Sequence, residues 1–284
     1  MKTSLVTGLL ALTLPFAASA REEGASANSL GLADAVRSSA VGPAALYFNP
    51  AAMHQFMQYA VESGYEYSQP MDAHTFSVSV VDSATNAMLA MGVGYSYIYG
   101  HEFDSDNART GHNLRFGGAS GFRGNGYSVH AGLSGRYLSL TIGEDGAAEG
   151  ITMDAGLLVV IADLFRIGIV GHHLIETGLG ETPRQMGIGA SVYASSFLLA
   201  FDTVLDFETA EETSAQYRVG LEYAVGERVP LRIGYETNRL TGDHAITAGL
   251  GFVSRLVGVD FGFRQSLVND ADNVFSLNVR GFVP

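Results

Sequence analysis

The sequence predicts an all-β protein, namely a transmembrane antiparallel β-barrel of about 14 strands with a short N-terminal hatch, or plug, inside its lumen. Three observations support this. Apolar residues recur at every second position over most of the chain, the number of such segments is even, and the connections alternate between long acidic and short ones. The alternative is a large soluble β-sandwich with its aromatic residues in a dry core.

Residues 1–20 have the features of a cleaved secretory signal peptide. Lys2 supplies the positive start, an apolar stretch runs from Leu5 to Phe16, and Ala18-Ser19-Ala20 places small residues before Arg21. We therefore expect a bacterial protein that leaves the cytoplasm.

Residues 21–56 precede the first expected strand and have a different character. Leu30 to Val36 predicts a short helix. The stretch from Gly42 to Met53 predicts a compact, turn-rich segment, because Pro43 and Pro50 bias the residues before them away from helix. The segment is too apolar to hang in water, so we expect it inside the barrel as a hatch.

Residues 57–284 show the strand period of two and form the expected barrel domain. In the stretch from Tyr217 to Tyr223, for example, apolar residues alternate with Arg218, Gly220 and Glu222. Most segments reach the roughly 9–11 residues that a tilted strand needs to cross the hydrocarbon layer. The expected strands are 57–69, 74–81, 87–99, 110–121, 126–142, 151–161, 165–175, 184–193, 196–205, 215–225, 229–238, 244–253, 256–267 and 274–283.

The longer connections carry most of the acidic residues and only Arg109 and Arg239 as bases. Long external loops and short periplasmic turns are the rule in outer-membrane barrels, whereas a sandwich gives no reason for this asymmetry. Carboxylates are ligands for Ca²⁺ or Mg²⁺, which could bridge the loops to lipopolysaccharide; simple solvation of these acids is the alternative. The acids in question are Asp104, Asp106, Glu208, Glu211 and Glu212.

Charges of both signs fall on the inward face and predict a lumen charge network. A turn at 226–229 would set Arg218 opposite Glu236 and Glu222 opposite Arg232, and the turn around Asp163 would set Asp154 opposite His172. Such pairs brace and fill a lumen. The predicted network comprises Asp154, His172, Arg218, Glu222, Arg232, Glu236, Asp260 and Arg264.

Composition and motifs exclude several other functions. A net charge of −13 argues against nucleic-acid binding, and the absence of cysteine excludes thiolate chemistry. We expect no catalytic residues, no cofactor and no metal, since neighbouring strand residues such as His172 and His173 should point to opposite faces. An enzyme would need a cluster such as His101 with Glu102, Asp104 and Asp106, which is better explained as a solvated loop.

Two segments near the N-terminus resemble the hatch of the outer-membrane long-chain fatty-acid transporter (FadL) superfamily. They are Ser29-Leu30-Gly31-Leu32-Ala33-Asp34-Ala35 and Tyr47-Phe48-Asn49-Pro50-Ala51-Ala52-Met53, and Asn49, Pro50 and Ala51 carry the hatch signature. The strand phrases Met153-Asp154-Ala155-Gly156-Leu157-Leu158 and Val219-Gly220-Leu221-Glu222-Tyr223 are similar to those of the superfamily and of its PorV-like secretion-scaffold branch.

The resemblance implies passive uptake of small hydrophobic compounds across the bacterial outer membrane, with lateral exit through the wall. Gly92 and Gly94 are the predicted lateral gate, because residues without side chains weaken a strand. The partners of the protein would be outer-membrane lipids and lipopolysaccharide. The alternative is a PorV-like scaffold without transport activity, which would bind a protein partner. The outer loops are shorter than the external capture groove of the fatty-acid transporters requires.

Overall fold

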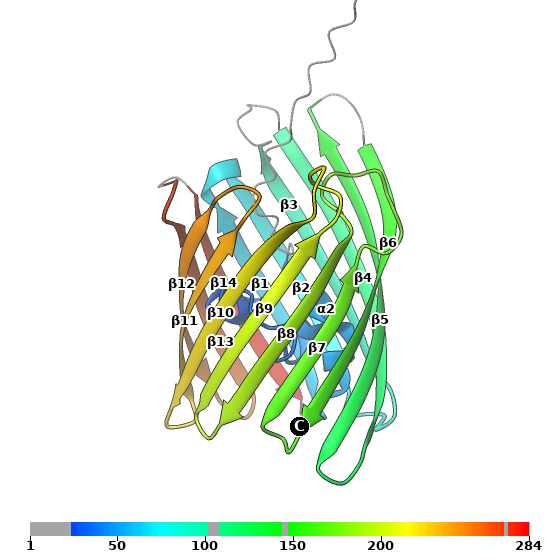
Figure 1. The fold of residues 1–284 in the computed structure, drawn as a ribbon, viewed down its shortest axis with the longest axis vertical. Coiled ribbons are helices and arrows are strands. Elements are labelled where there is room, and N and C mark those ends of the chain that lie inside the picture. The colour runs from blue at the N-terminus through cyan, green and yellow to red at the C-terminus, as the bar shows by residue number, and fades with distance from the viewer. Residues whose placement is uncertain (1–23, 102–107, 144–146, 270–271, 284) are drawn as a thin grey trace, which may run out of the picture.

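The protein is a closed barrel of fourteen antiparallel strands around an N-terminal segment (Figure 1). The structure, a computed structural model, describes residues 24–101, 108–143, 147–269 and 272–283. The predicted signal peptide, 1–20, lies outside the described residues. The strands are β1 Tyr59–Ser68, β2 Ala73–Asp82, β3 Ala90–His101, β4 Ala108–Arg123, β5 Tyr127–Ile142, β6 Ala147–Ile161, β7 Phe165–His172, β8 Gln185–Ala194, β9 Phe197–Asp206, β10 Ser214–Val225, β11 Val229–Asn238, β12 His244–Val253, β13 Val257–Ser266 and β14 Asn273–Val283.

Each strand pairs with its neighbours in sequence, and β1 pairs with β14 to close the cylinder. Closure leaves no sheet edge unpaired, as the hydrocarbon layer requires of a spanning sheet. Every expected strand range overlaps one observed strand, so the fold class predicted from the sequence is confirmed. The turns 162–164, 195–196, 226–228 and 254–256 mark one end of the barrel, called here the short-turn end. The connection 83–89 also lies at this end but is longer than these turns.

The outward face of the wall is apolar along its strands. Ile233 is 60 % exposed, Leu133 55 % and Phe201 49 %, and similar side chains project from the other strands. An exposed apolar surface this continuous is far beyond what a water-soluble monomer tolerates, so the exterior faces lipid. The sandwich alternative is excluded by the closed strand order.

Among the described residues, no helix is both long and apolar enough to cross a membrane.

The segment 24–58 lies inside the cylinder and contains short helices (Figure 1). These are α1 Ala27–Leu30, α2 Pro43–Phe48 and the 3₁₀ helix η1 Pro50–His54, while the 3₁₀ helix η2 Gln69–Met71 lies in the first outer connection. α1 contacts β12, β13 and β14 on one side, and η1 contacts β4, β5 and β6 on the other. The segment therefore spans the lumen, and it is called the hatch below.

The local structure of the hatch corrects two expectations. The helix predicted over Leu30 to Val36 is wrong, because α1 ends at Leu30 and Ala33 and Asp34 take left-handed backbone angles. The stretch from Gly42 to Met53, expected to be compact and rich in turns, folds into the two short helices α2 and η1. Pro43 and Pro50 each begin a helix, a position in which the missing N–H is not needed, while Asn49 between them is extended as expected.

Candidate functional site

The hatch touches the inner wall at glycines. A Cβ on Gly132 of β5 would lie 2.5 Å from the Ala51 nitrogen, and one on Gly262 of β13 would lie 2.5 Å from the Ala27 oxygen. On β11, a Cβ on Gly234 would lie 2.7 Å from the backbone nitrogen of Ala33. The backbone of the hatch thus rests directly on the backbone of the wall, and side chains at these positions would exclude it. This contact accounts for some of the 35 glycines in the chain.

Asn49 joins two parts of the hatch to the wall. Its side-chain amide donates to the Arg37 carbonyl at 2.8 Å and to the Leu157 carbonyl of β6 at 3.1 Å. Its side-chain oxygen accepts from the Ala51 N–H at 3.2 Å, which caps η1. Asn49 and Ala51 are fully buried. The structure thus places Asn49, Pro50 and Ala51 where the hatch meets β5 and β6.

We expect Asn49→Ala to loosen the hatch without unfolding the barrel. The substitution removes these side-chain hydrogen bonds and leaves buried backbone groups unsatisfied, which costs about 1–3 kcal/mol. Hydrogen exchange should therefore speed up in residues 43–54 and stay unchanged in the barrel strands. Asn86→Ala, in the exposed connection at the short-turn end, is the control. Equal exchange of the hatch in both variants would contradict this role of Asn49.

A buried ion pair also fixes the hatch. The Arg37 guanidinium lies 3.2 Å from Asp202 of β9, and the Arg37 N–H donates to the same carboxylate at 2.9 Å. Both side chains are almost fully buried. The sequence analysis missed Arg37, although a lone base in an apolar segment that must enter a lumen is a usable indication of such a pair.

The predicted charge pairs form on the lumen wall between β10 and β1. Register sets Arg218 opposite Glu236 and Glu222 opposite Arg232, as expected, with closest N···O distances of 3.6 and 2.6 Å. The chain of ion pairs continues beyond these residues. Arg232 also binds Asp260 at 2.6 Å, Asp260 binds Arg280 at 2.7 Å, and Arg280 binds Glu62 at 3.1 Å.

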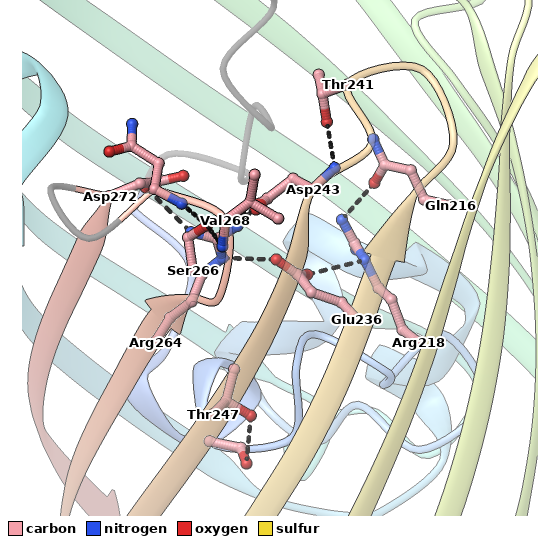
Figure 2. A network of polar contacts seen from close by, with 12 residues as sticks. Gln216, Arg218, Glu236, Thr241, Asp243, Thr247, Arg264, Ser266, Val268 and Asp272 are labelled. Carbon is pink, nitrogen blue, oxygen red and sulfur yellow. Dashed lines mark hydrogen bonds and ion pairs between the residues drawn. The ribbon is translucent and has the colours of Figure 1, made fainter.

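A second part of the network surrounds Arg264 toward the outer loops (Figure 2). The guanidinium binds Glu236 at 2.5 Å, Asp243 at 2.6 Å and Asp272 at 3.0 Å. Glu236 therefore links Arg264 to Arg218, as Figure 2 shows. Each arginine of this network has a carboxylate partner, so paired charges fill this side of the lumen.

Asp154 forms a third polar group on the opposite wall. It lies 3.4 Å from His172, as the register predicted, and 3.2 Å from Arg115. The expectation that His172 and His173 face opposite ways is wrong, because both are buried, at 0 % and 3 % exposure. β7 ends at His172, and the left-handed backbone angle of His173 breaks the alternation, so its ring contacts Arg136 at 3.1 Å inside the barrel.

Gly92 and Gly94 do not lie at a break in the wall. β3 pairs with β2 on one side and with β4 on the other through both glycines, so the wall is closed there in this structure. Both face the hatch instead. A Cβ on Gly92 would lie 2.9 Å from the Met53 sulfur, and one on Gly94 would lie 2.7 Å from the Tyr47 hydroxyl. Both glycines thus contact the hatch, and their role as a lateral gate stays a prediction.

The candidate loop groups are only partly described. Asp104 and Asp106, with Glu102 of the weighed enzyme cluster, lie outside the described residues. Glu208 binds Arg184 at 3.3 Å, and Glu211 and Glu212 are exposed. Within the described ranges, no group of three or more His, Asp or Glu side chains is arranged to hold a metal ion.

A hollow of about 750 Å³ lies on the lipid-facing side of β4, β5 and β6. Small residues such as Gly118, Ala131 and Ala155 form its floor, and Leu133 and Leu157 form its walls. On the other side of the same strands, Gly132 and Gly156 contact Asn49 and Pro50 of the hatch. At this place only backbone separates the hatch from the hydrophobic exterior.

Neither a protein-family model nor a curated protein matches the sequence. Solved structures do match. The CymD monoaromatic hydrocarbon channel is 14 % identical, with a TM-score of 0.69 over 92 % of this chain and 98 % of that chain. The toluene transporter TbuX of Ralstonia pickettii is 14 % identical, with a TM-score of 0.64 over the same shares. A FadL homologue of Pseudomonas aeruginosa is 12 % identical, with a TM-score of 0.65 over 90 % of this chain and 98 % of that chain. The chain therefore shares the barrel fold of the FadL homologue and of these hydrocarbon channels, and the resemblance predicted from the sequence is confirmed at the level of the fold.

Proposed function

We propose that this protein is an outer-membrane channel for passive uptake of small hydrophobic compounds, which leave the barrel sideways into the lipid. The observation that carries the proposal is the hatch seated in the closed barrel against β4–β6, directly behind an apolar hollow on the lipid side. The shared fold with hydrocarbon channels supports the same function. The expected role is therefore non-enzymatic.

Both apolar and charged groups lie beside the hatch. Leu46, Tyr47 and Met53 face the glycines of β3 and β4. The buried ion pair of Arg115 and Asp154 lies on the same side, with the Arg115 guanidinium 5.2 Å from the centroid of the Tyr47 ring. The proposed exit therefore depends on the thin wall between the hatch and the hollow at β4–β6, and not on an interior free of charge.

We expect Ala131→Phe, which fills the hollow, to slow uptake of toluene. The phenyl ring would occupy the volume through which an apolar solute joins the lipid. Ala190→Phe places the same ring on the lipid-facing side of β8 and serves as the matched control. The measurement is radiolabelled toluene uptake by cells that express each protein at equal level. Equal uptake with and without the unaltered protein would contradict the transport function itself.

The membrane assignment follows from the apolar exterior together with the predicted signal peptide, and lipopolysaccharide is the expected neighbour of the acidic loops. A PorV-like scaffold is the second candidate, and it would be compatible with the ion pairs that fill one side of the lumen. It would bring a protein partner and no solute flux. The uptake experiment separates the two.

A further inference from the structure

A histidine of the hatch lies against a histidine of the wall. His54 is the last residue of η1, and His130 lies near the start of β5. Their Nδ1 atoms are 3.1 Å apart. His130 is only 4 % exposed, whereas His54 is partly exposed at the short-turn end. The next residue of β5, Ala131, lines the apolar hollow on the lipid side. The two rings therefore join the hatch to the wall beside the proposed exit.

The hydrogen bonds of the two rings determine where their protons lie. The Nε2 atom of His54 is 3.0 Å from the carbonyl oxygen of Ala87, in the connection 83–89. A carbonyl can only accept, so this Nε2 carries a proton and the Nδ1 of the neutral ring is an acceptor. His130 must then donate its Nδ1–H to His54, and its Nε2 accepts from the Ser128 hydroxyl at 3.0 Å. Every ring nitrogen of the neutral pair is thus satisfied.

The pair can accommodate one added proton but not two. With one, His54 donates from Nδ1, and His130 accepts there and donates from Nε2 to Ser128. With two, both Nδ1 atoms carry protons and face each other. The ring centroids are 5.3 Å apart, and two unit charges at this separation repel, at an effective dielectric constant of about 20, enough to change an equilibrium about a hundredfold. Because the rings separate when η1 leaves β5, falling pH favours the undocked hatch.

No negative charge of the described chain compensates the pair. The elements packed against η1 are α2, β3, β4, β5 and β6. Arg123 of β4 acts electrostatically on His130, and it is positive. The carboxylates on these elements are Glu149, which is exposed toward the outer end of β6, and Asp154, which is bound to Arg115. The connection 83–89 contains no charged residue. Repulsion within the doubly protonated pair is therefore not offset.

We propose that the contact between His54 and His130 is an acid-sensitive switch of the hatch. At neutral pH the hydrogen bond between the rings holds η1 against β5. Protonation of both rings releases η1 from β5 and frees the connection 83–89, which His54 binds through Ala87. The switch does not depend on the transport function, because movement of the hatch can be measured without a solute.

The test is hydrogen exchange of the full mature chain in detergent at pH 7.5 and at pH 4, compared with His54→Gln. The amide of glutamine cannot take up the charge, and comparison at the same pH removes the effect of pH on intrinsic exchange. At pH 4 we expect residues 51–56 to exchange at least about tenfold faster in the unaltered protein. At pH 7.5 the unaltered protein should exchange no faster than the variant, because only its histidine pair is intact. Conductance in planar bilayers should rise in acid in the unaltered protein alone.

The control variant is His112→Gln, which removes a histidine from the outward face of the neighbouring strand β4 and should keep the full acid response. His130→Gln removes the other ring of the pair and gives the same test if His54→Gln fails to fold, which circular dichroism shows. An acid response of equal size in the unaltered protein and in either pair variant would overturn the proposal, because carboxylates would then be its source. Loss of toluene uptake with an intact acid response would contradict the transport function and leave the switch standing.

Discussion

Removal of residues 28–53 opens the barrel to small polar solutes. This segment carries all of α2 and all but one residue each of α1 and η1, and its side chains, including Tyr47, Phe48 and Met53, are buried inside the lumen. Barrels of about eight strands are filled by their own side chains and those of about sixteen leave an aqueous channel, so fourteen strands enclose more space than the wall residues alone fill. The deletion should convert a barrel that conducts little into one with stepwise single-channel currents in planar bilayers.

The deletion leaves the barrel wall intact, because β1 begins at Tyr59 and its pairing with β2 and β14 does not involve the hatch. The ion pairs among Arg232, Asp260 and Arg280 also remain, so the opened channel should stay partly obstructed on that side. The unaltered protein is the control. Unchanged permeability to both hydrophobic and small polar probes would show that the hatch does not block the lumen.

Gly132→Val should displace the hatch from the wall while leaving all of its residues present. The added side chain would start 2.5 Å from the backbone of Pro50 and Ala51, which cannot move aside as a flexible side chain can. Overpacking of this kind costs about 1–3 kcal/mol, and here the cost falls on docking of the hatch. We expect faster hydrogen exchange in residues 43–54 together with increased conductance.

Gly118→Val is a matched control for Gly132→Val. Gly118 lies on the neighbouring strand β4 and faces the exterior, where the nearest atom to an added Cβ is 3.7 Å away. This variant should keep the exchange and conductance of the unaltered chain. If the two variants behave alike, the close contact at Gly132 is not what holds the hatch.

Much of the barrel could be predicted because its structure depends on a repeating pattern along each strand and on pairing between strands that are close in sequence. Lipid outside and polar groups inside impose alternation on every strand, which made the fourteen strands and the pairing of Arg218 with Glu236 readable from the sequence. A short turn such as 226–228 fixes which residues of the two adjoining strands lie opposite each other. Pairs of opposite charge could therefore be identified from residue numbers alone.

The hatch was less predictable, because its structure depends on the wall around it. Its helices are too short to be stable alone. The one helix that was predicted, over Leu30 to Val36, was placed too late in the chain, and α2 was expected to be part of a turn-rich segment. Arg37 was missed because Asp202, its partner, lies 165 positions away in the chain. His173 was misjudged because a single left-handed residue at the end of β7 cancels the alternation on which the argument rested.

The sequence by itself determined the barrel, its number of strands, which residues face outward and inward, and the main charge pairs. Each of these follows from the spacing of residues along one strand or across one turn. Only the tertiary structure decided what the glycines do. The sequence pattern is the same whether a strand glycine weakens a gate or makes room for a neighbouring segment. In the structure, Gly92 and Gly94 face side chains of the hatch, and Gly132 faces its backbone.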